Sequence, residues 1–123
     1  MSKLKLILKK DNPSLIKTKG KTAGKLPVEA ENISPDITAD KTISEIAELP
    51  LLAGRKKYKL EDFFQIEGEA SQNIFIEGEL DNFKYIGAAM TAGEIFINGS
   101  TGMHTGSEMS GGKIEINGDT GEW

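Results

Sequence analysis

The chain has 123 residues, a formal net charge of −4 at pH 7 and no cysteine, so it cannot form disulfides or supply thiolates to a zinc site or an iron–sulfur cluster. This length accommodates one domain, or a small domain with an extension. No apolar run approaches the roughly 18 residues of a membrane helix, and the N-terminus has no signal-peptide cleavage site. We therefore expect a cytoplasmic protein that does not insert into membranes.

The charges are unevenly distributed along the chain. Residues 1–25 carry eight lysines and one acidic residue, whereas residues 26–123 carry seven basic and eighteen acidic residues. A basic segment can bind nucleic acid, but this one contains no arginine and no aromatic residue, and the acidic remainder would repel phosphate. We expect no nucleic-acid binding and interpret the segment as a solvated hairpin or as a contact to an acidic partner surface.

Residues 1–62 are predicted to form an N-terminal capping segment of strands plus one short helix. Leucines alternate with other residues over 3–9, which indicates a strand, and residues 12–25 indicate a loop or a long hairpin connection. A second extended segment is expected at 27–33. Thr42 and Glu45 then form a capping-box pattern at the start of a helix that ends before Pro50.

An exposed basic stretch at 55–60 leads into the remainder of the chain. Residues 66–69 (IEGE) resemble residues 76–79 and are expected to enter the repeated structure described next. Phe63 and Phe64 should plug its first coil, because the end of a repeat stack otherwise exposes its strand edges and core.

The last third of the chain repeats with a period of 19 residues. The recurring pairs are Gly87/Gly106, Met90/Met109, Gly93/Gly112, Ile95/Ile114, Ile97/Ile116, Asn98/Asn117, Gly99/Gly118 and Gly102/Gly121. A looser copy containing Ile74, Ile76 and Gly78 lies 21 residues before its counterpart. A fixed period of this size is typical of a stacked repeat architecture.

Each repeat holds one alternating segment: NIFIE, EIFIN or KIEIN. Isoleucine keeps the first and third apolar positions and should face inward, whereas the middle position changes from Phe75 to Phe96 to Glu115 and should face outward. Short strands between glycine corners predict a mainly β fold: a right-handed parallel β-helix of about 19 residues per lap over residues 63–123, incomplete at its C-terminus.

Stacked laps predict columns of like residues. The predicted core is Ile74, Ile76, Met90, Ile95, Ile97, Met109, Ile114 and Ile116, and the predicted corners are Gly78, Gly87, Gly93, Gly99, Gly102, Gly106, Gly112, Gly118 and Gly121. Tyr85, His104 and Trp123 should form an aromatic ladder, and Asn98 should bond to Asn117. The last lap would leave its core side open to water. We expect either a fragment of a longer protein, which we favour, or coverage by a partner or a second copy.

Three groups of residues superficially resemble sites. His104 has no second histidine or cysteine with which to share a metal, and it fits the aromatic ladder. The acidic residues Glu67, Glu69, Glu77, Glu79 and Asp81 resemble paired catalytic carboxylates, but they flank corners where solvated acids are ordinary. The glycines around 102–112 lack the strand-then-helix context of a phosphate loop. We therefore predict no catalytic, cofactor-binding or metal-binding residue. Phe75 and Phe96 lie either under the N-terminal segment or in a partner interface.

Three stretches resemble the C subunit of formylmethanofuran dehydrogenase. They are PVEAENISPD (27–36), LPLLAGRKKYKLEDFFQIEGEA (49–70) and above all YIGAAMTAGEIFINGSTGMHTGSEMSGGKIEINGDTGEW (85–123). That subunit shares its glycine-repeat β-helix with the C-terminal domain of the glutamate synthase large subunit. The resemblance covers nearly all of the chain from about residue 25, and family members continue for several more laps.

The resemblance implies a structural subunit of an oxidoreductase complex. This complex reduces CO2 with methanofuran in the first step of methanogenesis, or runs the reverse, in methanogenic and related archaea. Pterin-binding, metal-hydrolase-like and ferredoxin-like partner subunits would hold the tungsten or molybdenum pterin, the iron–sulfur clusters and the dinuclear metal centre. Three alternatives stay open: the C subunit of a formyltransferase/hydrolase complex of methylotrophic bacteria, a spacer like that of glutamate synthase, and a free-standing structural β-helix.

Overall fold

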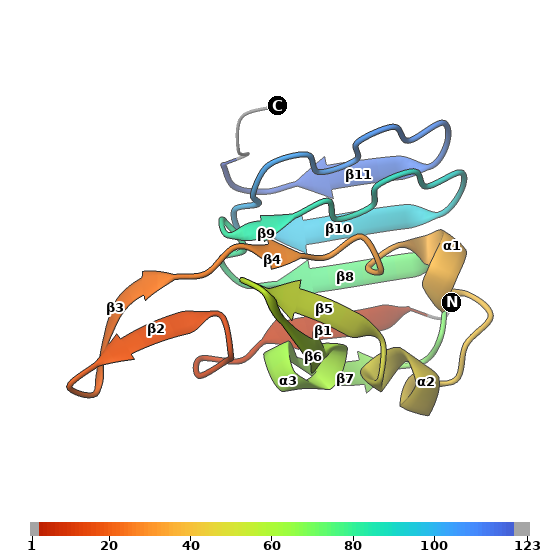
Figure 1. Cartoon of the computed structure of the whole chain (residues 1–123). Coiled ribbons are helices and arrows are strands. Elements are labelled where there is room, and N and C mark those ends of the chain that lie inside the picture. Colours follow the sequence, from red (N-terminus) through yellow and green to blue (C-terminus); the bar gives the residue numbers. More distant parts are fainter. Residues whose placement is uncertain (1–2, 120–123) are drawn as a thin grey trace.

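A computed structural model describes residues 3–119, which are mainly β (Figure 1). The strands are β1 (Leu4–Leu8), β2 (Leu15–Thr18), β3 (Lys21–Lys25), β4 (Val28–Glu29), β5 (Pro50–Ala53), β6 (Lys56–Lys59), β7 (Phe64–Gly68), β8 (Asn73–Glu77), β9 (Phe83–Lys84), β10 (Glu94–Asn98) and β11 (Lys113–Ile116). The helices are α1 (Pro35–Thr38), α2 (Ile43–Ala47) and α3 (Leu60–Phe63). No helix in this part of the chain is long and apolar enough to cross a membrane.

The largest sheet has five strands in the order β11-β10-β8-β1-β7. Strands β8, β10 and β11 are parallel, and their register places Ile95 beside both Ile74 and Ile114, and Ile97 beside both Ile76 and Ile116. The repeat spacing read from the sequence therefore equals the pairing register. Ile74, Ile76, Met90, Ile95 and Ile97 are fully buried, whereas Met109, Ile114 and Ile116 are only partly buried at the outer end of the stack.

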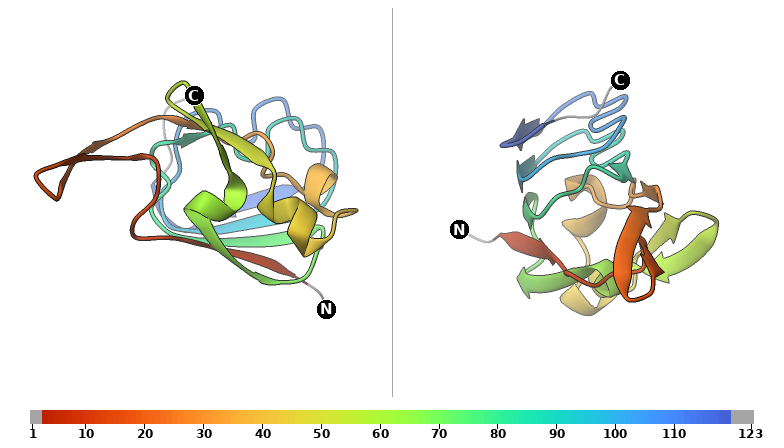
Figure 2. Two further views of the ribbon diagram at one scale, coloured as in Figure 1. Left: turned by 60° about the horizontal axis from the view of Figure 1, so that its bottom comes forward. Right: turned by 90° about the vertical axis from the view of Figure 1, so that its left-hand side faces the viewer.

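The connections between these strands stack as well as the strands themselves (Figure 2). Backbone hydrogen bonds join equivalent turns: Tyr85 N–H donates to the Met103 carbonyl, and Ala89 N–H donates to the Ser107 carbonyl. The backbone angles repeat too, because φ is +68° at Tyr85 and +61° at His104. Each repeat therefore satisfies its polar backbone groups with those of its neighbour, in loops as in strands.

Two glycine positions show why the turns need glycine. Gly87 has a φ of +71°, and a Cβ placed there would lie 2.7 Å from Cδ1 of Ile114. Gly102 is different: its φ is not positive, but a Cβ would collide with the carbonyl oxygen of Phe83 in the preceding repeat. Close approach between repeats can therefore demand glycine as strictly as a left-handed backbone does. Gly121 lies outside the described residues.

The N-terminal strand β1 is inserted into the repeat sheet. It pairs parallel to β8, with Leu4 beside Ile74 and Leu6 beside Ile76, and antiparallel to β7 on its other side. The expectation that residues 66–69 begin the parallel stack is therefore wrong. The alternating leucines of β1 fill the position beside β8, so β7 is placed one strand further out and runs in the opposite direction.

A four-stranded sheet of order β6-β5-β4-β9 and the three helices cover the other side of the core. The helix predicted after Thr42 is confirmed as α2, with both hydrogen bonds of its capping box. Phe63 and Phe64 are buried and contact Phe83, with ring centroids 5.8 Å and 5.6 Å from it. These rings join the N-terminal elements to the repeats in one continuous core.

Candidate interaction surface

The outer face of the five-stranded sheet carries two neighbouring phenylalanines whose rings are tilted by 33° to each other. Phe75 on β8 and Phe96 on β10 have ring centroids 5.7 Å apart, and Lys3 Nζ lies 5.0 Å from the Phe75 centroid. Lys5, Glu77 and other neighbours line a hollow of about 140 Å³ around these rings. Strand β1 pairs beside β8 and does not cross the two rings. Both rings are half-buried, and the N-terminal segment reaches one of them through the Lys3 ammonium.

His104 stacks on Tyr85, as the 19-residue spacing predicts. The ring centroids are 5.1 Å apart and the planes differ by 10°. The third predicted member of the ladder, Trp123, lies outside the described residues. Asn117 Nδ2 likewise donates to Asn98 Oδ1 at 3.2 Å. These contacts link successive repeats. Stacking therefore explains why Tyr85 and His104, and likewise Asn98 and Asn117, lie 19 residues apart.

The acidic residues that resemble catalytic pairs are spread along the molecule. Glu77 pairs with Lys5 at 3.4 Å, Asp81 pairs with Lys25 at 2.7 Å, and Glu67 accepts a hydrogen bond from Gln65. Each of these carboxylates is exposed or half-exposed, where ion pairs contribute little. The arrangement provides none of the buried, opposed carboxylates that glycoside chemistry uses.

The donor atoms of the chain do not match the metal groups of the resembled family. The chain has no cysteine, and residues 3–119 contain no group of three or more His, Asp or Glu side chains placed to hold a metal ion. Iron–sulfur clusters need thiolates, so the residues of this chain do not fit such a cofactor.

Asp36 connects the N-terminal segment to the repeats. Its carboxylate, in the first turn of α1, accepts hydrogen bonds from Thr91 N at 3.0 Å and from Thr91 Oγ1 at 2.9 Å. The Thr91 backbone hydrogen bond, followed by that of its hydroxyl, lowers the pKa of Asp36 below its ordinary value. The sequence offered no signal for this contact, because 55 residues separate the partners.

Strands β2 and β3 form a hairpin that projects from the body of the molecule (Figures 1 and 2). Its turn has φ values of +53° at Lys19 and +77° at Gly20, which match the two-residue turn that suits hairpin twist. Every residue from Ile16 to Ala23 is exposed. The expectation of a loop or hairpin over residues 12–25 is thus resolved as a hairpin with solvent on both faces.

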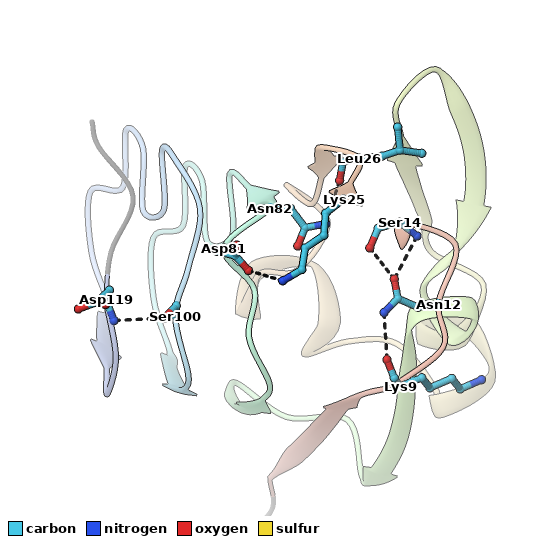
Figure 3. Close-up of polar contacts among 9 residues, drawn as sticks. All are labelled: Lys9, Asn12, Ser14, Lys25, Leu26, Asp81, Asn82, Ser100 and Asp119. Carbon is cyan, nitrogen blue, oxygen red and sulfur yellow. Dashed lines mark hydrogen bonds and ion pairs between the residues drawn. The ribbon is translucent and has the colours of Figure 1, made fainter. Parts of the chain in front are cut away.

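Polar contacts anchor the base of this hairpin (Figure 3). Asn12 Oδ1 accepts hydrogen bonds from the backbone and the hydroxyl of Ser14. On the other strand, Asn82 Nδ2 donates to the Leu26 carbonyl at 2.8 Å, and Lys25 pairs with Asp81 at 2.7 Å. The hairpin is therefore tied to Asp81 and Asn82 at its C-terminal end, and its N-terminal end is held by local contacts around Asn12 and by the Leu26 N–H, which donates to the Ser14 carbonyl.

Similarity to a solved structure supports the fold. The chain matches a structure of the formyltransferase/hydrolase complex from Methylorubrum extorquens in complex with methylofuran, with a TM-score of 0.66 and 25% identity, covering 95% of this chain and 47% of that chain. The chain is thus a mainly β protein whose fold is represented in that formyltransferase/hydrolase complex. No family model matches the sequence.

The sequence relatives identify the family more specifically than the structural match does. The C subunit of the tungsten-containing formylmethanofuran dehydrogenase 2 of Methanothermobacter thermautotrophicus is 42% identical over 86 residues, covering 66% of this chain and 32% of the relative. The C subunit of the molybdenum-containing formylmethanofuran dehydrogenase 1 of Methanosarcina barkeri is 39% identical, covering 68% and 30%. The tungsten-containing counterpart from Methanococcus maripaludis is 35% identical, covering 77% and 35%. The chain is a homologue of the formylmethanofuran dehydrogenase C subunit, and it spans about a third of the length of these curated relatives.

Proposed function

We propose that this chain is a non-catalytic structural subunit of a formylmethanofuran dehydrogenase complex, which reduces CO2 with methanofuran or catalyses the reverse reaction. The observation that supports this most is its 35–42% identity to the C subunit of tungsten and molybdenum forms of that enzyme. The pterin, the iron–sulfur clusters and the dinuclear metal centre would then lie in partner subunits. The donor set of this chain agrees with that division, because it contains no thiolate and one histidine.

The architecture we propose is a right-handed parallel β-helix within residues 63–123, whose parallel strands start at β8, and an N-terminal segment over residues 1–62 that caps it. Parallel pairing of β8, β10 and β11, together with turns that repeat every 19 residues, supports the helix. Its right hand follows from the strong preference of parallel crossovers. Strand β1 adds a further rung to the stack, since its leucines extend the isoleucine columns. Such a stack offers flat, rigid walls, which suit a scaffold.

A second candidate is the corresponding subunit of a formyltransferase/hydrolase complex. The structural match to the Methylorubrum extorquens complex, which covers 95% of this chain, supports it. The two candidates share the same physical role, and they differ in the partners that the chain joins. Co-purification from the source separates them: a cysteine-rich, ferredoxin-like partner and a pterin-binding partner identify the dehydrogenase, and a formyltransferase partner without these identifies the alternative.

The scaffold role is tested by comparing the isolated chain with the assembled complex. The chain alone should show no formylmethanofuran dehydrogenase activity and no stoichiometric metal, and a complex reconstituted with it should be active. A His104→Ala complex should keep most of this activity, because the imidazole stacks on Tyr85 as part of the repeat. Turnover by the chain alone, or loss of turnover in a fully assembled His104→Ala complex, would contradict the proposal.

A further inference from the structure

The lysines of the N-terminal segment do not all have the same surroundings. Lys17 pairs with Asp11 at 3.8 Å, Lys25 pairs with Asp81 at 2.7 Å, and Lys9 Nζ donates to the Glu61 carbonyl. Two other lysines, Lys19 and Lys21, lie at the hairpin tip. Among the described residues, neither of them forms an ion pair. The projecting end of the hairpin therefore carries two lysines whose charge no ion pair within residues 3–119 offsets.

The hairpin combines this charge with an exposed apolar side chain. Ile16 lies opposite Gly24 and Thr18 lies opposite Lys21, and the register shifts by one residue between these two pairs. Ile16 is 42% exposed, and its Cδ1 would be 3.7 Å from a Cβ placed on Gly24. The missing side chain at Gly24 leaves the isoleucine uncovered. An exposed isoleucine on a hairpin with unpaired lysines suits an apolar contact with a partner surface whose surrounding charge is negative.

A groove at the base of the hairpin is also lined mainly by basic residues among its charged ones. It has a volume of about 350 Å³ and lies between the hairpin, the end of β1 and the corner at Gly78. Its charged lining residues are Lys9, Lys10, Lys25 and Glu79. The tip and the groove thus form one basic surface, which we call the basic arm: Lys10, Ile16, Lys19, Lys21 and the groove.

The geometry points to the basic arm as a docking site for an acidic surface on another subunit of the complex, an inference that rests on the proposed function. The arm suits this role because its base is fixed by the Asn12, Asn82 and Lys25 contacts, so little ordering would accompany binding. A two-stranded hairpin with solvent on both faces is marginal by itself, and a partner would complete its packing. Nucleic acid fits less well, since the arm has no aromatic side chain on which a base could stack.

The test uses the full chain and the remaining subunits of the complex, co-expressed without it. The test variant is Lys19→Glu/Lys21→Glu, and the control is Lys56→Glu/Lys57→Glu, which makes the same charge change at exposed residues of β6. Both should melt like the wild type, because neither pair is buried. At physiological salt the arm variant should bind the partner subunits about tenfold more weakly, mainly through slower association, and the control should bind normally.

Zero-length carbodiimide coupling adds a readout that identifies the contact. It should join Lys10, Lys19 or Lys21 to aspartates or glutamates of a partner subunit, and adding salt should reduce the yield. Normal assembly of the arm variant would show that these lysines only keep the hairpin solvated, and would overturn the inference while leaving the scaffold role intact. Failure of the wild-type chain to assemble would overturn both. Binding of the wild type, but not the arm variant, to a 20-base-pair duplex or to anionic phosphatidylserine vesicles at the same salt would overturn the inference in favour of a polyanion.

Discussion

In the stacked isoleucine columns, the loss of stability on truncation to alanine should depend on how deeply each isoleucine is buried. Ile97 is fully buried between Ile76 and Ile116, whereas Ile116 lies on the outermost strand and is half-buried. Ile97→Ala removes three carbons, worth about 0.8 kcal/mol each, and leaves a cavity in close-packed surroundings. We therefore expect a loss of about 3 to 4 kcal/mol in the free energy of unfolding. Ile116→Ala removes the same atoms from a partly wet site and should cost about 1 kcal/mol.

Urea unfolding followed by far-UV circular dichroism measures both losses. With an m value of about 2 kcal/mol/M, the midpoint should fall by about 1.5 to 2 M for Ile97→Ala and by about 0.5 M for Ile116→Ala, with m unchanged. Ile97→Asp, which buries an unpaired carboxylate, should abolish the cooperative transition or the assembly. Equal losses for the two alanine variants, or a loss below about 1 kcal/mol at Ile97, would refute the stacked-column reasoning.

Three further predictions use the same measurements. Gly99→Ala should lower the free energy of unfolding by more than about 3 kcal/mol, because the new Cβ collides with a carbonyl of the preceding repeat. Gly20→Ala has open space around the new Cβ and should cost only about 1 kcal/mol of backbone strain. Similar losses for the two variants would contradict this reasoning. The lowered pKa of Asp36 means that its stabilising contribution is present above the unfolded pKa of about 4 and is lost as pH falls through the lower folded value. Asp36→Asn should therefore reduce stability at pH 7 and flatten its decline on acidification, and an unchanged pH profile would contradict this assignment. His104→Ala should lower stability by about 1 kcal/mol through lost stacking and a left-handed backbone; an unchanged unfolding midpoint would argue against the ladder.

The candidate interaction surfaces of this molecule differ in how much of each could be predicted from the sequence. The charge imbalance of residues 1–25 is visible in the sequence, and so is the outward position of Phe75 and Phe96. The sequence does not reveal which lysines are already paired, since Lys25 meets Asp81 across 56 residues. Only the folded chain separates the neutralised lysines from those at the hairpin tip.

The repeat determined the pairing of β8, β10 and β11, because a fixed spacing with alternating isoleucines brings equivalent residues side by side wherever such strands stack. Tertiary structure alone decided where β1 would pair. Its leucine alternation predicts a strand with one buried face, and that pattern suits any free sheet edge. Strand β8 offered such an edge, and β1 occupied it while β7 paired antiparallel beyond. Long-range strand pairing depends on which backbone edge remains unpaired in three dimensions, and the local sequence carries no record of that.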